Sequence, residues 1–315
     1  MARLIEQVRG HDEVWRRLQA LRSRDHLPHA LAFTGPSGVG KNKMAWALAQ
    51  SVLCQRESQA PCGECGSCRR VEMRQSESVL SLAPASMGAP IKLEAAHQVL
   101  EFLSLSRLAK ARVVIVDEAQ SLNPQAANAL LKVIEEPPPA THFILVVPEI
   151  SQLLPTLRSR SQVVRFAPLS EEQLREGLEN AEAWVVRSAR GSFERLQDFQ
   201  SEDSEKSRQM AFDFLTAAAN GDRSGLEDIL NVARDRETAL ETVRFLQQAL
   251  RDWVLLETES VLHVDRLPLL RSLPPCRPDR KVELWRRALQ MENDLLGHVD
   301  RSLVLENFFY QARAH

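Results

Sequence analysis

Three features are scarce in this chain, and each scarcity argues against a class of protein. Aromatic residues make up 5% of the 315 residues, with one tyrosine, so a single-strand-binding surface built on base stacking is not expected. No apolar run approaches the length of a transmembrane helix, so no membrane association is expected. The formal net charge is −2, so any contact with nucleic acid is expected to be local or made through partners.

The chain does contain a glycine-rich loop, which reads Gly35-Pro36-Ser37-Gly38-Val39-Gly40-Lys41-Asn42. An apolar run at 30–34, typical of a buried strand, precedes the loop, and a helical pattern at 43–52 follows it. In the pattern G-x-x-x-x-G-K-[ST], backbone N–H groups and the lysine hold phosphates, and the final hydroxyl binds Mg²⁺. Asn42 replaces that hydroxyl. The sequence therefore predicts a nucleotide cradle whose placement of Mg²⁺ is in doubt.

Two carboxylates follow a second apolar run. Residues 112–116 are mostly β-branched and indicate a strand buried on both faces of a parallel sheet. Asp117 and Glu118 come directly after it, at the end of the strand where ligands bind in open α/β sheets. We expect Asp117 to hold Mg²⁺ directly or through water, and Glu118 to polarise an attacking water.

Four of the five cysteines lie within 15 residues, at Cys54, Cys62, Cys65 and Cys68. Thiolates at this spacing, with glycines between them, can surround a tetrahedral Zn²⁺, and a site filled by four sulfurs is structural. No secretory segment opens the chain, so a cytoplasmic location is expected, and disulfides are rare there. The spacing alone leaves an iron–sulfur cluster open. Cys276 stands apart and is interpreted as an ordinary thiol.

The hydrophobic pattern predicts an α/β domain followed by helices. Strands at 30–34, 78–82, 112–116, 143–147 and 162–166 alternate with helices at 12–24, 43–52, 92–108, 121–136 and 153–158, which indicates a parallel sheet with helices on both faces. Beyond residue 168 only helical periodicity is found. A polar stretch, 200–207, is interpreted as a linker. We expect a nucleotide-binding domain at 1–167 with the cysteine insert at 54–68, a helical lid at 168–204 and a helical collar at 205–315.

These motifs resemble the clamp-loader subunits of the AAA+ class that serve bacterial DNA polymerase III. The resemblance covers nearly the whole chain and rests on the cysteine insert and four further segments: 27–30, which lead into the loop, 117–122, 126–138 and 153–161. It implies an AAA+ P-loop domain with a zinc knuckle, a small lid and an all-α collar. It also implies a hetero-pentamer with a gamma/tau-like motor subunit and a delta-like subunit, which loads a sliding clamp on primer–template DNA.

The resemblance also assigns a role to Arg160. In this family a Ser-Arg-Cys motif presents an arginine finger to ATP held by the neighbouring subunit, and Ser159-Arg160-Ser161 matches it with the cysteine replaced. A guanidinium can neutralise charge that develops on the γ-phosphate. Two further departures weaken the chain's own site: Val147 stands where active relatives carry a polar sensor, and Glu194 stands where their lid carries a sensor arginine.

Three hypotheses follow from these residues. The first is a stator that hydrolyses ATP weakly or not at all and supplies Arg160 in trans. The second is an active ATPase motor of the same machine, which the retained Lys41, Asp117 and Glu118 favour. The third is a zinc-stabilised adaptor outside replication, with which the near-zero net charge is compatible. ATP or ADP binding is possible in the first two, and Mg²⁺ binding is doubtful.

Overall fold

The structure is a computed structural model, and it describes residues 2–86, 88–105, 110–178, 180–232, 235–297 and 299–313. The chain divides into two compact units. Unit 1 comprises residues 1–177 and 191–194, and unit 2 comprises residues 178–190 and 195–315. The three-domain division expected above remains a prediction.

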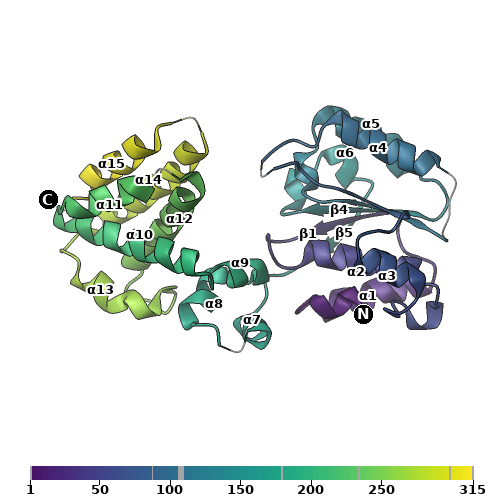
Figure 1. Ribbon diagram of the computed structural model, residues 1–315, viewed down its shortest axis with the longest axis horizontal. Coiled ribbons are helices and arrows are strands. Elements are labelled where there is room, and N and C mark those ends of the chain that lie inside the picture. The colour runs from purple at the N-terminus through teal and green to yellow at the C-terminus, as the bar shows by residue number, and fades with distance from the viewer. Residues whose placement is uncertain are drawn as a thin grey trace. The chain divides into compact units, whose positions relative to one another are not determined.

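Unit 1 is built on a five-stranded parallel sheet (Figure 1). The spatial order is β2-β3-β4-β1-β5, and the strands are β1 (Ala30–Thr34), β2 (Val79–Leu82), β3 (Arg112–Val116), β4 (Thr141–Val147) and β5 (Gln162–Arg165). All residues of β1 and β3 are buried, as are all but one of β4, whereas β2 and β5 are partly exposed. Burial on both faces explains why the central strands read as continuous apolar runs.

Helices cover both faces of the sheet, as the alternating pattern predicted. The helices are α1 (Asp12–Ser23), α2 (Lys41–Leu53), α3 (Gly66–Glu72), α4 (Leu93–Ser104), α5 (Pro124–Glu135), α6 (Pro155–Arg158) and α7 (Glu171–Gly177). Side chains of α1 and α2 pack on one face, where Phe33 and Ile115 contribute to a shared core. Side chains of α4, α5 and α6 pack on the other face, around Phe143 and Val116.

Two predicted helices in unit 1 extend three or more residues beyond the helices of the structure. The predicted helix at 121–136 begins only at Pro124, because Asn123 caps it by accepting a hydrogen bond from the Ala126 N–H, and 119–121 form a separate 3-10 turn. The predicted helix at 92–108 ends at Ser104, and residues 106–109 lie outside the described part of the chain. Both changes shorten a helix without moving the sheet.

Among its described residues, unit 2 contains helices joined by turns and no strand. Its helices are α8 (Ala183–Ala189), α9 (Phe193–Asp198, whose first two residues belong to unit 1), α10 (Glu202–Asn220), α11 (Ser224–Val232), α12 (Arg236–Val254), α13 (Leu267–Ser272), α14 (Pro278–Leu296) and α15 (Arg301–Ala312). Among the described residues, no helix combines the length and apolar character needed to cross a membrane.

The linker predicted at 200–207 is wrong, because Ser201 is the N-cap of α10 and residues 202–207 form its first turns. Ser201 caps the helix by accepting a hydrogen bond from the Ser204 N–H. Ser204 and Ser207 are buried, and both hydroxyls donate hydrogen bonds to the Glu241 carboxylate on α12. The polar composition therefore reflects a capped and hydrogen-bonded helix start.

A buried polar cluster joins α10 to the segment that follows α12. Arg208 is 1% exposed, its Nε donates a hydrogen bond of 3.1 Å to His263 Nδ1, and its guanidinium lies 3.8 Å from the ring centre of Trp184. Glu205 and Asp265 pair with the same guanidinium. Burial, together with the positive charges of Arg208 and Arg266, lowers the pKa of His263 to about 3. His263 therefore stays neutral in the folded chain at moderately acidic pH.

This arrangement predicts a loss of stability in acid. An unfolded histidine binds a proton below about pH 6.5, whereas folded His263 does so only near pH 3, so the His263 contribution is present above pH 6.5 and is lost as pH falls. Urea unfolding followed by circular dichroism measures the free energy of unfolding at pH 7 and at pH 5. Between these two pH values, His263→Gln should lose about 2 kcal/mol less of this free energy than the parent chain loses. Equal losses in the two proteins would contradict the assignment.

Candidate functional site

The glycine-rich loop joins β1 to α2 and needs glycine at particular positions. Gly35 and Gly38 have φ values of 151° and 74°, in the region where side chains are strained. A Cβ on Gly35 would lie 2.2 Å from the Phe166 carbonyl oxygen, and one on Gly38 would lie 2.0 Å from Ser192 Oγ. The loop is therefore enclosed by the chain on two sides, and only glycine fits there.

Lys41 is folded back onto the loop. Its side chain is buried, and Nζ donates hydrogen bonds of 2.6 Å to the carbonyl oxygens of both Gly35 and Pro36. Burial lowers the pKa of Lys41 and outweighs the carboxylates of Asp117 and Glu194, which raise it. Two of the three N–H donors of the ammonium group are thus used within the loop.

Asn42 contacts the residue that was expected to hold the metal. Its Nδ2 donates a hydrogen bond of 2.6 Å to Asp117 Oδ2, and the other Asp117 oxygen, Oδ1, accepts one of 3.1 Å from the Glu118 N–H. An amide NH₂ group is a donor and cannot ligate a cation, whereas a hydroxyl oxygen can. The chain therefore engages both oxygens of Asp117 and places a donor where Mg²⁺ would be bound.

The start of α9 lies against the same loop. The backbone N–H groups of Phe193 and Glu194 donate to the Gly38 carbonyl oxygen at 3.0 and 3.3 Å. The Glu194 carboxylate is close enough to Lys41 to raise its pKa, although burial has the larger effect. An acid near a phosphate cradle repels phosphate, so Glu194 opposes nucleotide binding at the place where active relatives are expected to carry an arginine.

Two further expected site residues, Glu118 and Val147, lie at the carboxyl ends of β3 and β4. Glu118 follows β3 with φ of 47° and is exposed, so its carboxylate is accessible to solvent. Val147 ends β4 between the two strands that carry the loop and Asp117, and it is fully buried. An apolar side chain there offers no hydrogen bond to a phosphate or to a water.

Arg160 lies away from the loop and is held in place. It follows α6, its Nη1 donates to the Thr156 carbonyl oxygen at 3.0 Å and to Ser159 Oγ at 3.2 Å, and its Nη2 pairs with Glu135 at the end of α5. The side chain is 37% exposed, so part of the guanidinium remains accessible. Sequence reasoning named Arg160 but missed Glu135 as its partner, although Glu135 belongs to one of the recognised segments.

The four clustered cysteines converge on one point. Their Sγ atoms all lie within 4.8 Å of one another. A tetrahedral zinc site with bonds of about 2.3 Å has sulfur–sulfur separations of about 3.8 Å, so the cluster fits a metal after small adjustments. The N–H groups of Cys65 and Cys68 point at the Sγ atoms of Cys62 and Cys65, at 3.3 and 3.5 Å, an arrangement that stabilises thiolates.

A buried glutamine connects this cluster to α2, the helix that follows the glycine-rich loop. Gln50 lies on α2 and is fully buried. Its Nε2 donates to the Cys68 carbonyl oxygen at 3.1 Å, and its Oε1 accepts from the Leu4 N–H at 2.9 Å. The cysteine insert and the N-terminal segment therefore share one anchor. The sequence offered no sign of this role.

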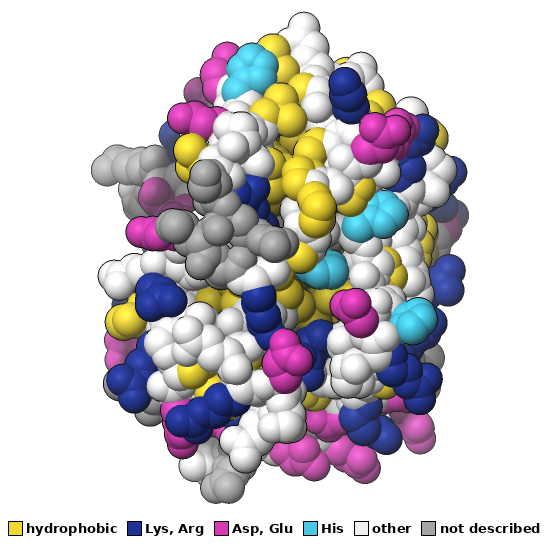
Figure 2. All heavy atoms as spheres, turned by 90° about the vertical axis from the view of Figure 1, so that its right-hand side faces the viewer, with side chains coloured by type: hydrophobic (Ala, Val, Ile, Leu, Met, Phe, Trp, Pro, Cys, Tyr) yellow, Lys and Arg dark blue, Asp and Glu magenta, His cyan; other side chains and the backbone are white. Residues whose placement is uncertain are grey.

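Among the described residues, charged side chains of one sign form no broad patch on the face shown in Figure 2. Lysine and arginine side chains are interspersed with aspartate and glutamate, and hydrophobic side chains gather in the upper part of that face. The mixture agrees with the net charge of −2. This face alone does not resemble a surface for nucleic acid, which is dominated by positive charge.

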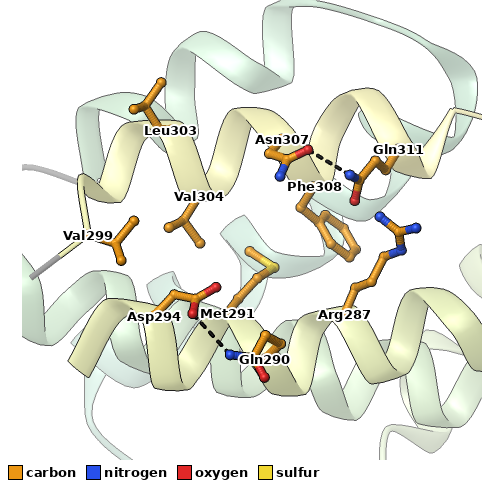
Figure 3. Close-up of a pocket in the computed structure, with 10 residues that line it drawn as sticks. All are labelled: Arg287, Gln290, Met291, Asp294, Val299, Leu303, Val304, Asn307, Phe308 and Gln311. Carbon is orange, nitrogen blue, oxygen red and sulfur yellow. Dashed lines mark hydrogen bonds between the residues drawn. The ribbon is translucent and has the colours of Figure 1, made fainter. Parts of the chain in front are cut away.

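A hollow of about 330 Å³ lies between α14 and α15 in unit 2 (Figure 3). Met291, Val304 and Phe308 form its apolar floor. Its amide side chains are paired along their own helices, through the Gln290–Asp294 and Asn307–Gln311 hydrogen bonds. The described lining residues include no nucleophile with an adjacent base, and their apolar floor is typical of a packing surface.

The comparisons with known proteins agree with this geometry. A family model described as DNA polymerase III, delta subunit, matches residues 10–170, which is just over half of the chain. The chain belongs to this family. Residues 10–170 include the loop, the cysteine cluster and Arg160. The family predicted from the sequence is confirmed.

Curated relatives support the same family. The chain is 35% identical over 142 residues to DNA polymerase III subunit delta′ of Pseudomonas aeruginosa. This match covers 44% of this chain and 43% of that protein. The chain is 37% identical over 146 residues to the same subunit of Escherichia coli K12, which covers 46% and 44%. The chain thus spans less than half the length of the curated relatives it matches.

A solved structure supports the fold. The gamma subunit-related protein of DNA polymerase III from Thermotoga maritima aligns with a TM-score of 0.54 at 15% identity, over 94% of this chain and 98% of that one. At this identity the likeness shows the fold alone. The predicted fold class is confirmed: a parallel sheet with helices on both faces and a four-cysteine insert, followed by helices.

The structure brings the expected residues together in two places. Residues 35–42 and Asp117 meet at the ends of β1 and β3, and the four cysteines meet beside α2. Arg160 lies apart from the loop, which suits a residue expected to act on a neighbour. The roles assigned to these residues remain predictions.

The Asn42–Asp117 contact predicts how metal affects nucleotide binding. Asn42→Thr removes the competing donor and supplies a hydroxyl ligand, so Mg²⁺ should strengthen binding of a fluorescent ADP analogue about tenfold or more in this variant. In the parent chain, Mg²⁺ should change binding by less than about twofold. Titrations with Mg²⁺ and with EDTA measure both.

Asn42→Ala is the matched control, because it breaks the hydrogen bond without adding a ligand. Mg²⁺ should strengthen binding of the ADP analogue less in Asn42→Ala than in Asn42→Thr. If Mg²⁺ enhanced binding equally in the parent chain and in Asn42→Thr, the hydrogen bond would not be what limits the metal.

Proposed function

We propose that this chain is a clamp-loader subunit of a bacterial DNA polymerase III assembly and that it acts there as a stator. It hydrolyses ATP weakly or not at all and supplies Arg160 to the nucleotide site of a neighbouring subunit. The observation that carries the proposal is the Asn42–Asp117 hydrogen bond, because it engages, within the chain, the carboxylate that was expected to hold Mg²⁺. Membership of the family and the names of the relatives support the setting.

The partners follow from that setting. The neighbour that receives Arg160 is a gamma/tau-like motor subunit, and a delta-like subunit completes the hetero-pentamer. The assembly acts on a sliding clamp, and this chain meets primer–template DNA through the complex. The charge distribution supports the last point, because lysine and arginine are interspersed with aspartate and glutamate among the described residues of the face in Figure 2.

The C-terminal helices are proposed as the collar through which the subunits associate. Large hydrophobic side chains are exposed along α14 and α15: Leu289, Leu296, Leu303 and Tyr310, with Val299 between the helices. Leu303 is 62% exposed. Exposed apolar residues gathered on two neighbouring helices are typical of a protein interface. In this proposal, residues 168–204 serve as the lid and residues 205–315 as the collar.

An active ATPase motor is the second candidate. Lys41, Asp117 and Glu118 are all present, and Glu118 is exposed at the end of its strand, where a general base is needed. Against it stand the hydrogen-bonded Asp117, the buried Val147 and the acidic Glu194. The stator accounts for all of these features, whereas the motor accounts only for the retained residues.

We also propose that the four cysteines bind one structural Zn²⁺. Four sulfur ligands close the coordination sphere, so the metal would fix the insert and would take no part in a reaction. Its effect would reach α2 through Gln50, which holds the Cys68 carbonyl group. Loss of the metal would therefore loosen the support beneath the nucleotide site.

The zinc proposal predicts one metal per chain. Cys65→Ser should lower the zinc content several-fold and the midpoint of thermal unfolding, because a structural metal contributes folding free energy. Elemental analysis and thermal scans measure these effects. Cys276→Ser is the matched control, since this thiol lies outside the cluster, and it should keep the parent's zinc content. Iron found in place of zinc, or no bound metal, would contradict the proposal.

The finger role predicts a loss at the neighbour's site. In a complex reconstituted with the motor and delta-like subunits, Arg160→Ala should reduce DNA-stimulated ATP hydrolysis on the order of a hundredfold at the site it serves, with assembly preserved. Arg158→Ala is the control, because Arg158 is an exposed arginine of the same segment. Full ATPase activity with Arg160→Ala would refute the assignment.

A further inference from the structure

Strand β5 has one free edge. It lies at the end of the sheet and pairs only with β1. The Phe166 N–H donates to the Thr34 carbonyl oxygen, so the N–H and C=O groups of alternate residues, Val164 and Phe166, face β1. Those of Val163 and Arg165 therefore point away from the sheet. Within the described part of the chain, β5 has no second strand beside it.

A hollow of about 280 Å³ follows this edge. All four residues of β5 line it. Since successive side chains of a strand point to opposite faces, the hollow wraps around the edge of the sheet. On the α1 side its floor is apolar and consists of Val14, Leu18, Leu21 and Leu31. The space lies where a sixth strand would lie.

Charged groups at the rim indicate the chemistry of an occupant. Arg17 and Arg165 line the hollow, are exposed, and pair with no carboxylate among the residues that the structure describes. Glu13 also lines it, one helical turn before Arg17, so the rim carries two positive charges and one negative charge. The excess charge is positive, and guanidinium groups bind carboxylates in a bidentate manner.

We propose that the free edge of β5 receives an extended segment of a neighbouring subunit as an added strand. The segment pairs with the outward groups of Val163 and Arg165, places an apolar side chain against Val14 and Leu21, which are partly exposed, and presents a carboxylate to Arg17 or Arg165. Backbone pairing supplies affinity in such complexes, and side-chain pockets supply specificity.

The chemistry of the edge fits a polypeptide. A free strand edge offers alternating donors and acceptors at the spacing of another peptide backbone, and the apolar floor accepts a side chain. The identity of the partner rests on the proposed function. Strand β5 begins two residues beyond Arg160, so a subunit engaged by that arginine is joined to this edge by a short stretch of chain.

Two variants test the proposal without altering Arg160. Val163→Pro removes an outward N–H that the β1–β5 ladder does not use, and it blocks strand addition. Val163→Ala is its matched control, because it keeps the N–H. The double variant Arg17→Glu, Arg165→Glu leaves the backbone unchanged and reverses the charge of the rim.

The experiment uses the full chain with the motor and delta-like subunits. Val163→Pro and the double charge variant should each weaken association about tenfold in sedimentation or anisotropy titrations, whereas Val163→Ala should not. In the parent complex, hydrogen exchange at 161–166 should be slower than in the chain alone. Thermal unfolding of each variant shows whether a loss of association is caused by misfolding.

The outcomes separate this inference from the proposed function. A complex that forms with unchanged exchange at 161–166, or that tolerates both variants, overturns the strand-addition proposal and leaves the stator intact. A parent chain that does not associate with those subunits overturns both. Self-association of the chain alone, abolished by Val163→Pro, would make a second copy the occupant and would also overturn the proposal.

Discussion

The hydrogen bond between Asn42 and Asp117 is the contact on which the functional interpretation depends. The sheet order brings the ends of β1 and β3 to the two sides of β4, so the glycine-rich loop and the acidic strand end meet as they do in a nucleotide site. There, the polar groups expected to bind Mg²⁺ and phosphate form hydrogen bonds within the chain. Asp117 accepts two hydrogen bonds, and Lys41 donates to two loop carbonyls. A site whose groups are already paired gains less from Mg²⁺ and phosphate than one whose groups are free. We therefore propose that this chain retains the architecture of a nucleotide site while its binding of Mg²⁺ is weakened.

A scaffold with a weakened site still positions other groups well. Buried cores on both faces fix the sheet, and Gln50 joins the cysteine insert to the helix that follows the loop. The same sheet carries Arg160 beyond α6, where Glu135 orients it. Because these supports need no nucleotide, the chain can present Arg160 in a constant orientation, which is what a stator requires.

The sequence predicted the sheet better than it predicted the contacts. Strands β1 and β3 have the predicted bounds because fully buried parallel strands are continuous apolar runs. The polar residues at the start of α10 led to the wrong prediction of a linker. The cap at Ser201 and the acids of the first turn are sequence signals of a helix start, and they were given too little weight. The Asn42–Asp117 hydrogen bond joins residues 75 positions apart, and the Arg160–Glu135 pair joins two helix ends, so neither follows from a local pattern. Motif positions identified the candidate residues, and only the fold showed which of them are already engaged.

The most direct test of the account is ATP hydrolysis at this chain's own site within the assembly. The chain would be combined with motor subunits whose phosphate-loop lysines are replaced, so that any remaining turnover belongs to this chain. The account predicts turnover at the background of the assay, with sliding clamp and primed DNA present. Turnover on the order of 1 s⁻¹ or more, lost on Lys41→Ala, would identify a motor and contradict the stator.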